Sequence, residues 1–142
     1  MRQHFQFAYA LACYMLFLIT FAALVFFLLN IKDMRGPPAG GVWKSGLIDL
    51  VMISLFGFSH SLMARPWFKR LWTRVIPSAT ERATYVLQSS LFLLLIFWQW
   101  RPIPALVWQF DGLAAVVLYT VFGIGAAVVT LSTFLLGHFE FV

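Results

Sequence analysis

Long apolar runs separated by short polar connections organise this chain. The runs cover residues 7–31, 47–64, 78–100 and 112–136, and the charged residues gather mainly between them. A helix needs roughly 20 apolar residues to cross the hydrocarbon core of a bilayer. The pattern therefore predicts an all-α fold, a polytopic membrane helical bundle with about four transmembrane helices, forming a single domain over residues 1–142.

Residues that break or cap helices mark the boundaries of these runs. Glycine and proline fill the connection at 36–41, and Pro102 stops the third run. Ser78 and Glu81 have the spacing of a capping box, in which both side chains accept hydrogen bonds from free amides at a helix start. Asp111 is placed to cap the fourth helix.

Composition agrees with a membrane environment. Hydrophobic residues make up 62% of the chain and charged residues 11%, against about 25% charged in a soluble domain. The net charge of +5 lies in the connections, where it meets anionic headgroups rather than nucleic acid. The connection 65–82 is the richest in basic residues, so the positive-inside rule places it, and both termini, in the cytoplasm.

Ionisable residues inside the apolar runs are the first candidates for chemistry, because burying charge in a membrane is costly. Asp49 and His60 lie eleven residues apart, on one helix face but separated by a rise of about 16 Å, so they cannot form one site. His60 shares the predicted cytoplasmic end with His138 and Glu140, and these three can converge.

Two interpretations of His60 stay open at this stage. It either transfers a proton, binds a metal or haem, or contacts a cofactor, or else it bonds to a neighbouring serine, such as Ser59 or Ser61, or to a backbone carbonyl. The polar run 88–90 likewise either lines a pocket or bonds to a neighbouring helix. Two histidines and the lone Cys13 are too few for a zinc site, so no metal is predicted.

Small residues recur on the second and fourth helices at spacings that favour close helix packing in lipid. On the second helix they are Ser54, Gly57 and Ser61, and on the fourth they include Gly123 and Ala127. We expect these stripes to form helix contacts.

Several segments resemble the NnrU/nurim-like family of membrane proteins over nearly the whole chain. They are Phe-Ser-His-Ser-Leu-Met-Ala-Arg-Pro at 58–66, Phe-Lys-Arg at 68–70, Thr-Glu-Arg-Ala-Thr-Tyr-Val-Leu at 80–87, Phe-Trp-Gln-Trp-Arg-Pro at 97–102 and Thr-Phe-Leu-Leu-Gly-His-Phe-Glu at 133–140. The resemblance implies a bacterial inner-membrane protein related to membrane methyltransferases. Bacterial members include methanethiol S-methyltransferases, which use S-adenosylmethionine to make dimethyl sulfide, and a distant branch resembles a haem-dependent carotene isomerase.

The resemblance also marks six residues of this chain for a cytoplasm-facing site. They are His60, Glu81 and His138 as candidate catalytic residues, and Arg65, Arg82 and Glu140 as candidates for binding the cofactor. Similar family members continue past the last of these segments into another helix, whereas this chain stops at Val142. The resemblance therefore implies that part of the site lies outside this sequence.

These expectations leave three possible functions. Two of them involve a cofactor, and the third is not catalytic. The first, which we favour, is a membrane S-methyltransferase that uses S-adenosylmethionine and a small thiol. The second is a haem protein with His60 and His138 as axial ligands. The third is a non-catalytic module that assembles with copies of itself or with another membrane protein.

Overall fold

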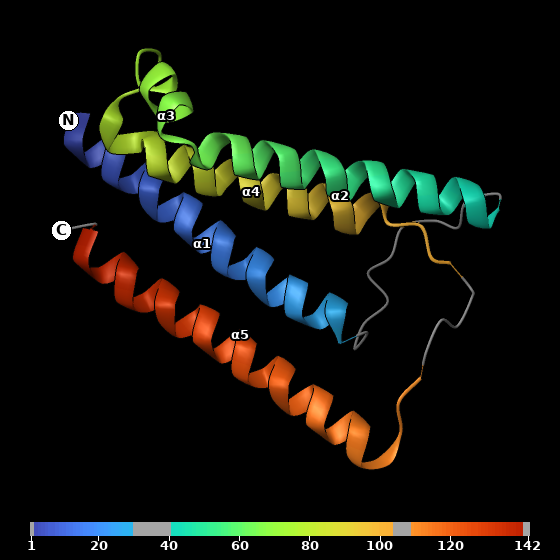
Figure 1. Cartoon of the computed structure of the whole chain (residues 1–142). Helices are drawn as coiled ribbons and strands as arrows, with labels where there is room; N and C mark the ends of the chain where they lie inside the picture. Colours follow the sequence, from blue (N-terminus) through green and yellow to red (C-terminus); the bar gives the residue numbers. More distant parts are fainter. Residues whose placement is uncertain (1, 30–40, 104–108, 141–142) are drawn as a thin grey trace. The chain divides into compact units, whose positions relative to one another are not determined.

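The computed structural model describes residues 2–29, 41–103 and 109–140, and gives side chains at 4–29, 41–103, 109–133 and 135. Its described residues form helices and no strand, so the predicted all-α class is confirmed. The helices are α1 (Arg2–Leu28), α2 (Val42–Ala64), α3 (Pro66–Trp72), α4 (Ser78–Gln99) and α5 (Gly112–Glu140) (Figure 1). The chain divides into two units, Met1–Pro104 and Ala105–Val142, and its description as one domain stays a prediction.

Helix α4 is the centre of the first unit, because it packs against both α1 and α2 (Figure 1). Tyr9 bonds to Thr84 near the start of α1 and α4, at 3.1 Å between their hydroxyl oxygens. Phe27 and Phe97 meet near the two helix ends, with ring centroids 5.1 Å apart. These two contacts show that α1 and α4 run in the same direction, and the chain order makes α2 run the opposite way.

A seven-residue repeat forms the contact between α1 and α4. Seven residues are close to two helical turns, so side chains at this spacing form one stripe along a helix. The buried members are Cys13 and Thr20 on α1, and Ala83, Ser90 and Phe97 on α4. Most are small, which lets the two backbones approach closely where lipid provides no hydrophobic drive for association.

Among the residues that the structure describes, three helices are long and apolar enough to cross a membrane: His4–Leu28 within α1, α2, and Gly112–Thr133 within α5. The chain is therefore a multi-pass integral membrane protein. Helix α4, the remaining predicted span, is 22 residues long but less apolar than these three. Its polar side chains find partners because α4 lies between α1 and α2. Thr84 bonds to α1, and Ser89 bonds to α2.

Threonines on the apolar helices satisfy their own hydroxyl groups. Thr20, Thr120, Thr130 and Thr133 each donate to the backbone carbonyl four residues earlier, at 2.8–2.9 Å. A hydroxyl bonded in this way needs no water, so it is tolerated both at an exposed surface that faces lipid, as at Thr120, and inside the α1–α4 contact, as at Thr20.

The structure corrects the expected boundaries around the second helix. Helix α2 begins at Val42, five residues before the predicted start, so Asp49 lies inside the helix rather than at its edge. A short helix, α3, occupies the basic connection that the sequence pattern left without an element. Pro66 stands at its first position, where a missing amide hydrogen costs nothing.

One further expectation about local contacts is wrong, and a second is not met within the first unit. The capping box is absent, because Pro77 precedes α4 without a side-chain cap and Glu81 instead pairs with Lys69. The small residues Ser54, Gly57 and Ser61 lie on an exposed face of α2. A Cβ added at Gly57 would have no described atom within 4 Å, so this stripe makes no close helix contact within Met1–Pro104, and its packing against α5 or another chain stays a prediction.

Asp49 ties the start of α2 to the end of α4. Its side chain is only 5% exposed, and Oδ1 accepts a hydrogen bond of 2.9 Å from the backbone N–H of Arg101, two residues after α4. The carboxylate therefore supplies an acceptor to a backbone donor that no helix satisfies. This contact holds the end of the first unit that lies away from α3.

Replacing Asp49 with alanine should lower the free energy of unfolding by about 1–3 kcal/mol, because the Arg101 amide then loses its acceptor. Asp49→Asn keeps an acceptor oxygen and should cost clearly less. Reversible unfolding in mixed detergent, followed by circular dichroism, measures both variants. Equal losses for the two substitutions would show that this hydrogen bond does not hold the helix end.

Candidate functional site

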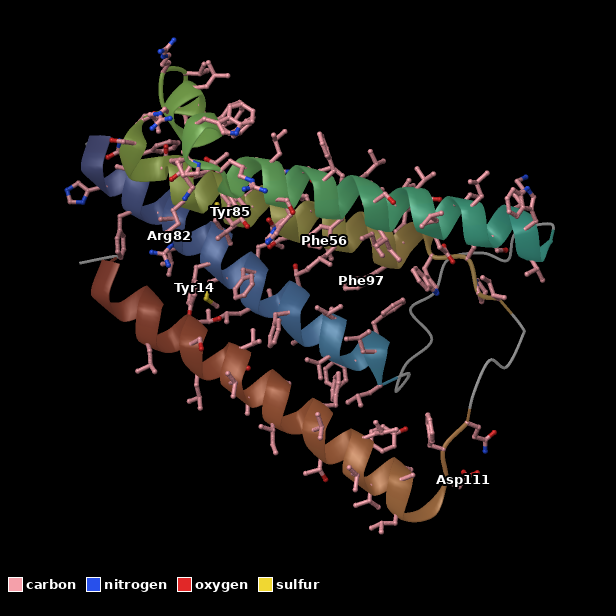
Figure 2. The ribbon with its side chains drawn as sticks, viewed as in Figure 1. Tyr14, Phe56, Arg82, Tyr85, Phe97 and Asp111 are labelled. Atoms are coloured by element: carbon pink, nitrogen blue, oxygen red, sulfur yellow. The ribbon has the colours of Figure 1, made fainter. Side chains whose placement is uncertain are left out.

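His60 lies in the last two turns of α2 and faces α4. Its ring lies between two aromatic rings, with centroid separations of 5.3 Å to Phe56 and 5.0 Å to Tyr85. Figure 2 labels both neighbours, Phe56 on α2 and Tyr85 on α4. The histidine is partly buried at the contact between α2 and α4.

Both ring nitrogens of His60 are within hydrogen-bond distance of hydroxyl groups on α4. The Tyr85 oxygen lies 2.7 Å from Nε2 and 3.2 Å from Nδ1, and Ser89 Oγ lies 3.0 Å from Nδ1. A neutral imidazole has one donor and one acceptor nitrogen. Because the Tyr85 oxygen is within 3.2 Å of both nitrogens, it lies over the face of the ring, whereas Ser89 Oγ approaches Nδ1 alone.

These partners differ from those expected from the sequence. The neighbouring Ser59 donates to the carbonyl of Phe56 instead of bonding to the histidine, at 3.1 Å. Ser89 belongs to the polar run 88–90, for which both a pocket and a helix contact had been open, and it makes the contact to α2. Sequence reasoning missed Tyr85, although Tyr85 and Ser89 are four residues apart and so lie on one helix face.

Three of the other candidate residues lie around α3, at the same end of the first unit as His60: Arg65, Glu81 and Arg82. Arg65 links α2 to α3, its N–H donating to Leu62 and its carbonyl accepting from Lys69. Glu81 pairs with Lys69 at 3.7 Å, with the two side chains 16% and 46% exposed. Such an accessible pair contributes about 0–1 kcal/mol, so it orients α3 against α4 rather than holding the fold together.

Arg82 follows Glu81 and lies one helical turn before Tyr85 on α4 (Figure 2). Its side chain is partly buried and interacts with other residues. The structure thus brings His60, Arg65, Glu81 and Arg82 to one end of the first unit. Asp49 lies at the other end, as the eleven-residue separation predicted.

The last two candidates, His138 and Glu140, belong to the final turn of α5. Their side chains are outside the described set, so their convergence with His60 stays a prediction.

Some buried polar atoms of the first unit have no hydrogen-bond partner among the described residues. They include Gln88 Oε1, next to Ser89, and Trp72 Nε1, at the end of α3. Buried polar groups are normally paired, so these two atoms are available to a bound polar molecule. Within the described ranges no three His, Cys, Asp or Glu side chains lie close enough to hold a metal ion.

The haem alternative gains no support from this geometry. An axial histidine needs a free nitrogen for iron, whereas both nitrogens of His60 are near hydroxyl oxygens of α4.

Known proteins that this chain matches share one name, methanethiol S-methyltransferase. The chain is 42% identical over 140 residues to a methanethiol S-methyltransferase of Crocosphaera subtropica, covering 96% of this chain and 55% of that protein. It is 44% identical over 137 residues to one of a Pseudomonas species, covering 93% and 52% of the two chains. It is 38% identical over 144 residues to one of Mycobacterium tuberculosis, covering 99% and 59%.

The chain thus spans about half the length of the curated relatives it matches. No family model matches the sequence. No solved structure matches it either.

Proposed function

Because the chain belongs to the family of membrane proteins that includes the methanethiol S-methyltransferases, we propose that it forms the membrane-embedded site of an S-methyltransferase acting on a small thiol. The substrate is methanethiol or a thiol of similar size, and the product is the methyl thioether, dimethyl sulfide in the case of methanethiol. The observation that carries the proposal is the 38–46% identity to proteins of that name, which extends over almost the whole chain in most of them.

The methyl donor we propose is S-adenosylmethionine, which supplies an electrophilic methyl group on a sulfonium. Three side chains of the first unit fit such a molecule in their chemistry. Arg65 and Arg82 provide guanidinium groups that suit its carboxylate. Gln88 Oε1 is a buried acceptor without a donor among the described residues, which an amino group of the cofactor would satisfy.

Residues of this chain would remove the proton from the thiol. A thiol attacks as its thiolate, so a group that accepts the thiol proton accelerates the reaction. His60 is the candidate acceptor of this proton. Histidine is a common general base, and this one is partly buried next to the hydroxyl groups of Tyr85 and Ser89. The apolar rings of Phe56 and Tyr85 beside it keep water away from a nascent thiolate. Glu81 acts indirectly, by holding Lys69 and α3.

The direct test is thioether formation by the detergent-purified chain. Supplied with S-adenosylmethionine and methanethiol, it should release dimethyl sulfide, measured in the headspace by gas chromatography. Use of a donor with a deuterated methyl group shows that the new methyl comes from the donor. Folded protein that yields no labelled thioether would refute the proposal for this chain.

For the orientation, we propose a bacterial inner-membrane location with both termini and α3 in the cytoplasm. The basic residues Arg65, Lys69, Arg70 and Arg74 around α3 support this, by the positive-inside rule. With the buried Cys13 changed to serine, an Arg70→Cys variant should react with a membrane-impermeant maleimide in inverted vesicles and remain unlabelled in intact spheroplasts. The reverse labelling pattern would invert the topology.

A further inference from the structure

Helix α3 and the turn that follows it carry exposed apolar and basic side chains. Trp67 and Leu71 are each 53% exposed, and Val75 is 79% exposed. Arg70 and Arg74 are exposed as well. We propose that these five residues, the α3 surface, bind anionic phospholipid at the membrane boundary, with the apolar side chains among the acyl chains and the two guanidinium groups on lipid phosphates. This interaction does not depend on the proposed methyl transfer.

The backbone places the two kinds of side chain next to each other. Residues three or four apart are neighbours on a helix. Trp67 and Leu71 therefore form one apolar row, and Arg70 lies beside it. Backbone hydrogen bonds continue the helical winding through the turn 73–76, so the apolar and basic rows extend into this turn.

The other side of α3 is held by the first unit. Phe68 and Trp72 are partly buried, and their rings stack with centroids 6.0 Å apart. Lys69 pairs with Glu81 in the first turn of α4, at 3.7 Å. Helix α3 is thus fixed where α2 ends and α4 begins, with the α3 surface turned outward (Figure 1).

The position of α3 in the chain keeps this surface at the level of the lipid headgroups. Helix α2 is long and apolar enough to cross the membrane and ends at Ala64, while α4 begins at Ser78 and packs against α2. The short connection between them therefore cannot leave the membrane boundary. Tryptophan rings are enriched at this level, and an arginine can lay its apolar stem on acyl chains while its charged end reaches a phosphate.

The charge of the segment favours anionic lipid. Residues 65–74 contain four basic residues and no acidic one. In the part of the chain that the structure describes, the Glu81 carboxylate pairs with Lys69, and no ion pair involves Arg70 or Arg74. Two copies of the α3 surface would repel each other. A leaflet with anionic headgroups instead supplies acyl chains and phosphates within one surface, which suits both rows.

Quenching by brominated lipids tests the α3 surface in the full chain. With Cys13 changed to serine, Leu71→Cys carries an environment-sensitive fluorophore, and the protein is reconstituted in phosphatidylcholine vesicles with a small fraction of phosphatidylglycerol. The bromine atoms are placed on the acyl chains of one lipid or the other. We expect phosphatidylglycerol to quench about fivefold or more strongly per mole than phosphatidylcholine. The same fluorophore at Thr73→Cys, about half a helical turn away from Leu71, should be quenched less by both lipids.

Single charge variants identify the source of the preference. Arg70→Gln and Arg74→Gln should each reduce the preference for phosphatidylglycerol severalfold and leave quenching by phosphatidylcholine unchanged. Lys44→Gln is the matched control, because it removes an exposed basic residue in the first turn of α2, at the other end of the first unit. An equal loss of preference in Lys44→Gln, or equal quenching per mole by the two lipids in the parent protein, would overturn the proposal. Absence of quenching by either lipid would also overturn it, since the surface would then face water.

Lipid retention by the unlabelled chain provides a second test in case the fluorophore disturbs α3. Native mass spectrometry of the wild type, purified with an equal mixture of the two lipids, should show more bound phosphatidylglycerol than phosphatidylcholine. The double variant Arg70→Gln/Arg74→Gln should lose this excess. Equal retention of both lipids by the folded wild type would contradict the proposal, and that failure would leave the proposed methyl transfer untouched because neither measurement involves turnover.

Discussion

Replacing His60 with alanine should lower the rate of methyl transfer to methanethiol by about 10²–10⁴-fold, the usual contribution of a positioned proton acceptor. The variant removes the proposed base, which lies within hydrogen-bond distance of Tyr85 and Ser89, so the thiol proton should lose its acceptor. Initial rates of dimethyl sulfide release at saturating thiol give the effect on the reaction step rather than on binding.

Two variants separate this loss from a folding defect. His60→Gln keeps polar atoms near the two hydroxyls but cannot take up a proton, so it should be nearly as slow as the alanine variant. Asp49→Asn changes a carboxylate on the same helix that lies at the other end of the first unit, and it should retain most activity. Substantial activity in His60→Gln would rule out the imidazole as the base.

Replacing Phe97 with alanine should produce the largest loss of stability, about 3–5 kcal/mol. Phe97 is 4% exposed, ends the seven-residue stripe of α4, and packs 5.1 Å from Phe27 on α1. The substitution leaves a cavity where the two parallel helices meet. Denaturation in mixed detergent, followed by the far-ultraviolet circular dichroism of the helices, measures the loss.

Phe58→Ala is the matched control for that experiment. Phe58 is also a phenylalanine on a helix, but it is 68% exposed on α2, where lipid can fill the space that the ring leaves. We expect a change within about 0.5 kcal/mol. A Phe97→Ala variant no less stable than Phe58→Ala would mean that the α1–α4 contact does not hold the first unit together.

Hydrophobic patterning along the chain predicted the helical class and most of the helix positions. Apolar runs determine both, because each run is long enough to satisfy its own backbone in lipid. The same patterning missed α3, since a seven-residue helix between basic residues has too few turns to show a period. It also placed a capping box at Ser78, where the Lys69–Glu81 pair competes for the Glu81 carboxylate.

Prediction of the site was limited by contacts between helices. His60, Arg65, Glu81 and Arg82 were recognised from the sequence, and the structure brings them to one end of the first unit. The partners of His60 were not recognised, because the choice between Ser59 on its own helix and Ser89 on α4 depends on how α2 rotates against α4. A single sequence does not determine that rotation, and Tyr85 was missed for the same reason.

The most direct test of the central claim is calorimetric titration of the detergent-purified chain with S-adenosylmethionine, for the wild type, Arg82→Gln and Arg74→Gln. Both variants remove one positive charge near α3, but Arg82 is the proposed cofactor-binding residue and is partly buried, whereas Arg74 is exposed on the connection after α3. We predict saturable binding by the wild type, weakened about tenfold or more in Arg82→Gln and unchanged in Arg74→Gln. No binding by folded wild-type protein, or equal weakening in both variants, would contradict a methyl-donor site at this end of the first unit.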